Sequence, residues 1–163
     1  MKHWLWPAGV FVAVCLFGFG ARKAIGSVYG TGEALALLES LARSGLYLGS
    51  ASATASATTL ALMLTLIGVV RRSDHDFNDL VYENVERIAR LATISLLASL
   101  GLLLVLVFPV GEFDGIPNQW YPMMYEVLFG ATVMVVALLA ATVMMLYRTV
   151  RHVISHITPG SHV

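Results

Sequence analysis

The sequence predicts an all-α integral membrane protein: a four-transmembrane-helix bundle with an outer amphipathic helix and cytoplasmic helical extensions. Of its 163 residues, 58% are hydrophobic and only 12% are charged, whereas a soluble domain carries about a quarter charged residues. Residues 48–70, 91–110 and 127–147 contain no charged side chain. Each of these runs is long enough to cross a hydrocarbon core of about 30 Å as a helix.

The first predicted crossing covers residues 4–21. This apolar run follows Lys2 and ends at Arg22-Lys23, and its 18 residues would span about 27 Å, which is short for a crossing. A positive start, an apolar run and small residues before the charges are also typical of a signal peptide. We expect a retained helix, and three crossings after signal removal are the alternative.

The next segment, residues 32–47, is predicted as an amphipathic helix on the outer side. Its leucines recur at helical spacing, and Glu39 and Arg43 form an i,i+4 pair. It leads directly into the second crossing, residues 48–70. It either lies on the membrane surface or extends that crossing outward.

Residues 75–110 are predicted to form an inner helix that continues into the third crossing. Acidic residues come first and arginines last, as the helix dipole favours. The fourth crossing covers residues 122–147, with a helical tail to about residue 157. We expect an apolar stripe of the inner helix to pair with a stripe of the tail that runs from Tyr147 to Ile157.

The distribution of Lys and Arg predicts that both termini lie on the cytoplasmic side. The predicted inner side holds Lys2, Arg71, Arg72, Arg87, Arg90, Arg148 and Arg151, and the outer side holds Arg22, Lys23 and Arg43. Positive residues concentrate in cytoplasmic loops, so seven against three supports this orientation. Arg22-Lys23 opposes it, because alone this pair would draw the end of the first helix inward.

Small side chains dominate residues 49–59, GSASATASATT. Residues four apart share a helix face, so the sequence predicts a ladder of small residues for close helix packing. The ladder consists of Gly45, Gly49, Ala53, Ala57 and Ala61. A sparser counterpart on the fourth crossing consists of Gly130, Ala137 and Ala141, and we expect the two faces to pair.

The hydroxyls of this stretch have two interpretations. They bond to the preceding helical turn or to a neighbouring helix, or one hydroxyl face lines a water-filled path in an oligomer. On the second interpretation Ser52 and Ser56 lie near the path and Glu126 sits at its outer mouth. Glu126 otherwise reaches the outer interface or forms a buried pair with an outer basic residue, since carboxylates inside a membrane are costly.

Composition and motifs exclude several classes of function. The net charge is zero, which gives nucleic-acid binding no support. We predict no catalytic site, no cofactor and no metal centre. His152 and His156, at i,i+4, are the nearest approach to a metal-ligand pair, and a solvated helix face explains them better.

The leading functional hypothesis is a homo-oligomeric channel with the Ser/Thr-rich second crossing near its path. The alternative is a non-conducting scaffold or accessory subunit of a larger membrane complex. The expected partners are the lipid bilayer and either further copies of the chain or a partner membrane subunit.

Overall fold

The computed structural model describes residues 5–25, 31–72, 79–108, 117 and 120–157. Within these residues the chain forms four helices: α1 (Leu5–Ile25), α2 (Thr31–Arg72), α3 (Asp79–Val107) and α4 (Trp120–Ile157). All four are long and apolar enough to cross a membrane. The prediction of an all-helical chain is therefore confirmed, with four helices whose length and composition suit a membrane crossing.

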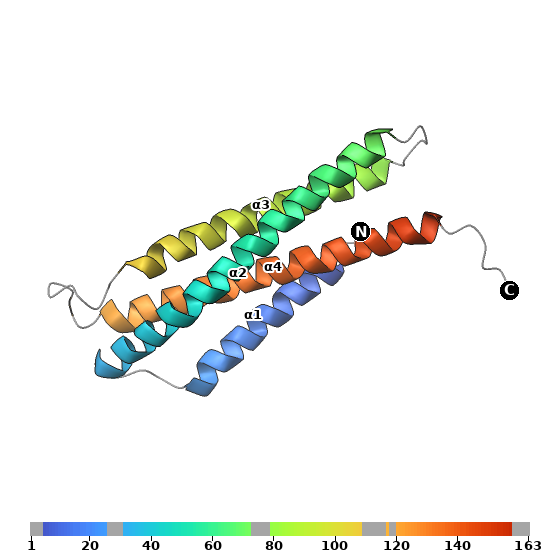
Figure 1. Ribbon diagram of the computed structural model, residues 1–163. Helices are drawn as coiled ribbons and strands as arrows, with labels where there is room; N and C mark the ends of the chain where they lie inside the picture. The colour runs from blue at the N-terminus through green and yellow to red at the C-terminus, as the bar shows by residue number, and fades with distance from the viewer. Residues whose placement is uncertain (1–4, 26–30, 73–78, 109–116, 118–119, 158–163) are drawn as a thin grey trace.

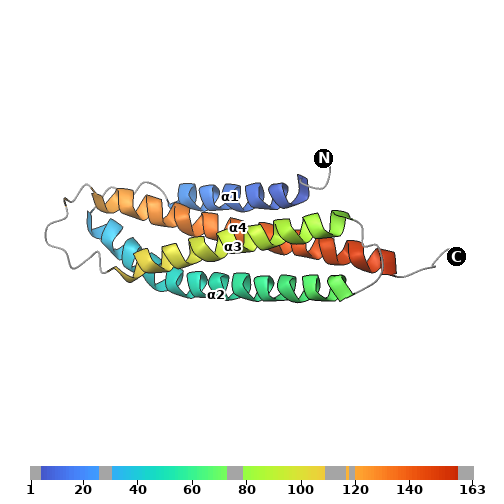
Figure 2. The same cartoon turned by 90° about the horizontal axis from the view of Figure 1, so that it is seen from above.

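The four helices alternate in direction, and the start of α1 and the end of α4 lie at the same end of the bundle (Figure 1). Helices α2, α3 and α4 all contact one another, whereas α1 packs mainly against α4. Seen from above, α1 lies along one side of the bundle beside α4, and α2 lies along the opposite side (Figure 2). The architecture is thus a three-helix group with a fourth helix added to the outside of α4.

The segment predicted as a separate amphipathic helix is the first part of α2. This helix is continuous over its 42 residues, a length of about 63 Å at 1.5 Å per residue. It exceeds the thickness of the hydrocarbon core by about twofold. Of the two sequence interpretations, an outward extension of the second crossing fits this continuity.

Along α3, and along α2 from Gly45 onward, the buried positions alternate in steps of three and four residues. On α2 they are Gly45, Gly49, Ser52, Ser56, Thr59 and Met63; on α3 they are Val85, Ile88, Ala92, Ser95, Ser99, Leu102 and Leu106. An average step of 3.5 residues keeps one stripe of a helix facing its neighbour along a left-handed bundle.

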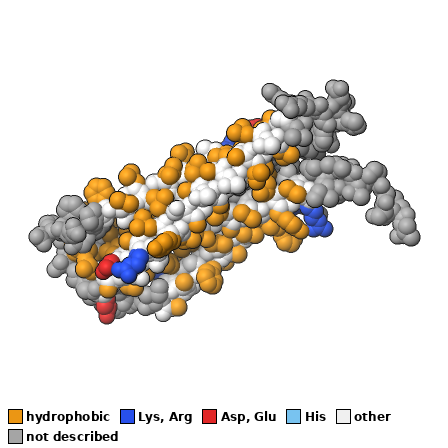
Figure 3. Space-filling model, in the orientation of Figure 1, with side chains coloured by type: hydrophobic (Ala, Val, Ile, Leu, Met, Phe, Trp, Pro, Cys, Tyr) orange, Lys and Arg blue, Asp and Glu red, His pale blue; other side chains and the backbone are white. Residues whose placement is uncertain are grey.

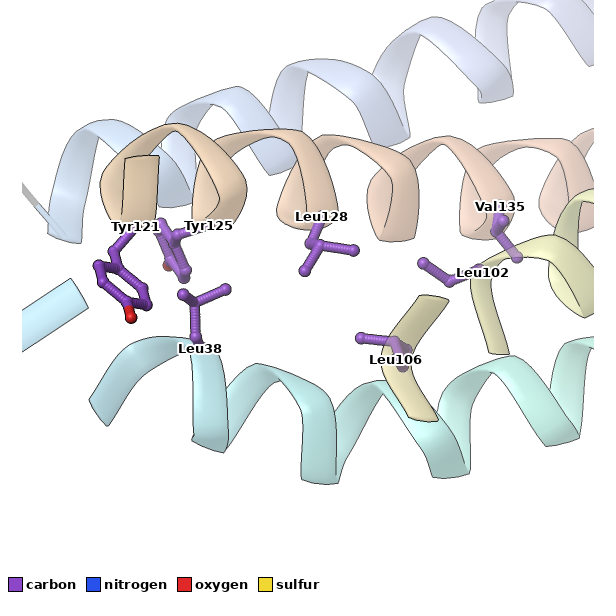
Figure 4. Packing of buried hydrophobic residues seen from close by; sticks show 7 residues of the cluster. All are labelled: Leu38, Leu102, Leu106, Tyr121, Tyr125, Leu128 and Val135. Carbon is purple, nitrogen blue, oxygen red and sulfur yellow. The ribbon is translucent and has the colours of Figure 1, made fainter. Parts of the chain in front are cut away.

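Two hydrophobic clusters close the ends of this group. Near the starts of α2 and α4, the first cluster joins Leu38, Leu102, Leu106, Tyr121, Tyr125, Leu128 and Val135 (Figure 4). Near the other end, the second cluster joins Met63, Val85, Ile88 and Met145. Small and hydroxyl side chains occupy the layer between them.

The expected pairing of the inner helix with the tail from Tyr147 to Ile157 stays a prediction. At this end of the bundle the hydrophobic cluster includes Met145 of α4, which belongs to the predicted fourth crossing and not to the tail. Met145 contacts the buried residues Val85 and Ile88 of α3, while Tyr147 and Val150 are exposed. Val153, Ile154 and Ile157 lie outside the residues whose side chains are described. The interface follows the 3.5-residue step along α4, which turns Tyr147 away from α3.

Helix α1 approaches α4 closely at a glycine. A Cβ atom added to Gly18 would lie 2.6 Å from Cγ1 and 3.2 Å from Cβ of Val133. Valine has two heavy atoms on Cβ and little freedom at χ1. The side chain of Val133 therefore cannot rotate away from an added Cβ atom. A Cβ on Gly20, two residues further along, would meet nothing within 4 Å.

We predict that Gly18→Ala loosens α1 from α4, at a cost of about 1–3 kcal/mol, the usual range for overpacking. The matched change Gly20→Ala should stay within about 0.5 kcal/mol of the parent, as surface changes do. The measurement is the free energy of unfolding of the protein in bicelles. Equal effects of the two substitutions would contradict the close approach at Gly18.

Candidate functional site

Four serines form the centre of the interface between α2 and α3. Ser52, Ser56, Ser95 and Ser99 are each 0% or 1% exposed, and we call them the serine cluster. The two hydroxyl oxygens of Ser56 and Ser95 are 3.1 Å apart, and those of Ser52 and Ser99 are 3.0 Å apart. Each pair joins one serine of α2 to one of α3.

The bonding within the cluster leaves its oxygens satisfied. The hydroxyl of Ser99 also lies 2.8 Å from the carbonyl oxygen of Ser95. A hydroxyl has one proton and two acceptor lone pairs, so donation from Ser99 to that carbonyl leaves its oxygen free to accept from Ser52. Among the described residues, every buried side-chain nitrogen and oxygen has a hydrogen-bond partner.

Threonines of α2 behave differently from its serines. Thr54, Thr58, Thr59 and Thr65 each donate to the carbonyl oxygen four residues earlier, at 2.8–3.0 Å. This back-bonding satisfies the hydroxyl within its own helix. The hydroxyl-rich stretch therefore combines interhelical serine bonds on one face with self-satisfied threonines, most of them on the other.

The predicted small-residue ladder of α2 divides between these two faces. Gly45 and Gly49 are buried against α3, where added Cβ atoms would lie 2.8 Å from Leu106 Cδ1 and 2.9 Å from Leu103 Cδ2. Ala53 is half-buried, and Ala57 and Ala61 are exposed. The contacts of both glycines with α3 differ from the expected pairing of this ladder with α4.

The corresponding residues of α4 are divided as well. Ala137 and Ala141 are buried, at 0% and 5% exposure. Gly130 is exposed, and a Cβ atom added there would meet nothing within 4 Å. The predicted ladder of α4 therefore contains both buried and exposed residues.

The exposed side of α2 carries small residues along most of its membrane length. Between positions 50 and 68 the exposed small side chains are Ser50, Ala51, Thr54, Ala57, Thr58, Ala61, Thr65 and Gly68. At 100° per residue they all fall within about 60° of Thr54, opposite the serine cluster. We call them the exposed small face of α2.

A shallow groove of about 870 Å³ lies at the start of this face, lined by Arg43, Leu46, Tyr47, Ser50, Ala51, Thr54 and Ala55. Arg43 pairs with Glu39 at 3.3 Å, and both side chains are largely exposed. Toward the two ends of the visible surface charged side chains gather, and hydrophobic ones cover much of the area between (Figure 3).

Glu126 pairs with Arg22 across the interface between α1 and α4. Both side chains are about half exposed, at 53% for Glu126 and 46% for Arg22. Arg22 lies in the last turn of α1, where a positive charge also interacts favourably with the helix dipole. The sequence interpretation that pairs Glu126 with a basic residue matches this contact in its partner, but it expected a buried pair, whereas both side chains are about half exposed.

The three candidate path residues are thus engaged at two separate interfaces. Ser52 and Ser56 face α3, and Glu126 faces α1. A path between copies of the chain stays a prediction. Sequence reasoning missed Ser95 and Ser99, although their i,i+4 spacing repeats that of Ser52 and Ser56 in a second apolar run.

Metal ligation has no support in the part of the chain that the structure describes. No three His, Cys, Asp or Glu side chains come together among these residues. The side chains of His152 and His156 lie outside them.

Comparison of the chain with protein-family models, with curated proteins and with solved structures finds no match. Its function is therefore argued from its own residues.

We predict that Ser56→Ala and Ser95→Ala are coupled. Each change should lower the free energy of unfolding by about 0.5–1.5 kcal/mol, and the double variant should cost less than the sum by about 0.6 kcal/mol, the average for hydrogen bonds between membrane helices. Ser50→Ala combined with Ser95→Ala is the control, because Ser50 is exposed. Strict additivity for Ser56 and Ser95 would count against their hydrogen bond.

Proposed function

We propose that this protein is a membrane-embedded assembly subunit that binds another transmembrane helix through the exposed small face of α2. It has no enzymatic activity of its own in this proposal, and the bundle acts as a rigid support for the face. The observation that carries the proposal is the contrast between α2 and the other helices at positions open to lipid.

A comparison with α3 illustrates the contrast, because α3 exposes bulky side chains where α2 exposes small ones. Between residues 93 and 108, the exposed bulky side chains of α3 are Ile94, Leu97, Leu100, Leu104, Val105, Val107 and Phe108. Between residues 50 and 68, α2 exposes only Leu62 and Leu64 as bulky side chains. Small residues are enriched where membrane helices pack together, because they allow two backbones to approach.

The two leucines support the same conclusion by their position. Leu62 and Leu64 fall about 80° to either side of Thr54 at 100° per residue, so they border the small face. A face of small side chains between two bulkier ones can receive the ridge of a partner helix, as ridges-into-grooves packing requires. The hydroxyls of Thr54, Thr58 and Thr65 donate to carbonyls of their own helix, and their oxygens keep lone pairs that can accept interhelical bonds.

The proposed subunit has both termini on the cytoplasmic side. The start of α1 and the end of α4 lie at one end of the bundle (Figure 1), together with the ends of α2 and α3 that carry Arg71, Arg72, Arg87 and Arg90. This concentration of arginines at one end supports a cytoplasmic location for that end.

A homo-oligomeric channel is the second candidate, favoured by the hydroxyls on the same exposed face. A ring of copies that turned Ser50, Thr54, Thr58 and Thr65 toward a common axis would create a polar lining. Three of these four hydroxyls already bond to carbonyls of their own helix. The subunit proposal needs no water at this face and is therefore preferred.

We predict that Ala57→Leu and Ala61→Leu weaken association of the protein in the membrane by at least about tenfold, equivalent to 1.4 kcal/mol, while leaving the bundle folded. The measurement is native mass spectrometry of nanodiscs, combined with crosslinking in the membrane of origin. Gly101→Leu is the control, since it places the same side chain on an open position of α3.

Undiminished association of both alanine variants would refute the docking face. A defined ring of three or more copies, with currents altered by Thr54→Leu, would favour the channel over the assembly subunit.

A further inference from the structure

We propose that Glu126 determines the orientation of α1 in the membrane, through its contact with Arg22 after α4 has been inserted. The inference rests on the proposed orientation with both termini in the cytoplasm. It goes beyond the assembly function, which concerns the opposite side of the bundle.

The charges that flank α1 conflict with its place in the bundle. Lys2 precedes the helix, and Arg22 and Lys23 lie in its last turn. Positive residues favour the cytoplasmic side, so these flanks would direct the last turn of α1 inward. The bundle holds that turn at the other end, where α4 begins and the cytoplasmic arginines are absent (Figure 1).

Glu126 offsets this conflict through a single ion pair with Arg22. Acidic residues contribute little to the charge rule itself, so a general excess of acid at that end would not suffice. The carboxylate of Glu126 instead contacts the guanidinium of Arg22 directly. Neither charge then has to be accommodated alone at the edge of the hydrocarbon core, where an isolated charge is costly.

The other contacts of α1 are also made mainly with α4, so the position of α1 depends on α4. Gly18 packs against Val133. Gly18 precedes Arg22 and Val133 follows Glu126, so the two contacts run in opposite directions along α1 and α4, as in an antiparallel pair. Because α1 packs mainly on α4, and Glu126 follows Arg22 by 104 positions, the pair cannot form until the fourth crossing has been made.

The experiment locates the start of α1 relative to the membrane in the full-length protein. Cys15→Ala removes the native thiol, and His3→Cys introduces a reporter without changing the flanking charges. A membrane-impermeant maleimide is applied to vesicles from each side. A second set carries Ser44→Cys in place of His3→Cys and reports on α2, where Ser44 is exposed.

In the parent we expect His3→Cys to react from the cytoplasmic side only. Glu126→Gln should increase its labelling from the opposite side several-fold, with Ser44→Cys unchanged. Adding Arg22→Gln and Lys23→Gln to Glu126→Gln should return the reporter to the cytoplasmic side, because the opposing charges are then gone. Arg22→Gln with Lys23→Gln alone should leave it there.

Three results would overturn the inference. The first is parental labelling of the Glu126→Gln variant. The second is equal misorientation when only Arg22 and Lys23 are changed, which would indicate loss of packing rather than release of a conflict. The third is movement of Ser44→Cys together with His3→Cys. Opposite-side labelling of His3→Cys in the parent would instead refute the orientation itself, independently of the docking face on α2.

Discussion

The close contact between α2 and α3 at the serine cluster constrains the rest of the bundle. Lipid is as apolar as leucine and gives no hydrophobic reward for helix association, so packing and hydrogen bonds must hold the helices together. Two serine pairs, at 3.0 and 3.1 Å, fix α2 in both register and rotation on α3. Because the serines point inward, the threonines and alanines on the opposite side of α2 necessarily point outward.

The all-helical fold and its four helices long and apolar enough to cross a membrane could be read from the sequence, whereas the rotation of α2 could not. A ladder with steps of four residues turns about 40° per step, so Ala61 lies about 160° around the helix from Gly45. The interface follows alternating steps of three and four instead. Small residues occur on every side of residues 49–59, so no apolar stripe marked the buried face, and only the partner helix distinguishes it.

The ion pair between Arg22 and Glu126 could not be predicted from local sequence patterns either, for a different reason. Arg22 and Glu126 are separated by most of the chain, and neither has a neighbour at i,i+4 that suggests a partner. Each residue alone looked anomalous in the sequence: a positive charge on the predicted outer side, and a carboxylate near the body of a crossing. Their contact accounts for both features together, since two opposite charges at close range stabilise each other.

A helix with small residues on two opposite faces fits the interior of an assembly better than its edge. In a single copy, α2 has neighbours on the serine side only, and its second small face would meet lipid chains that pack poorly against a shallow surface. The bulky exposed positions of α1 and α3, such as Phe17 at 80% and Leu104 at 70%, suit lipid well. Of these three helices, only α2 exposes a small face that suits lipid poorly. A second helix packed between Leu62 and Leu64 would cover that face.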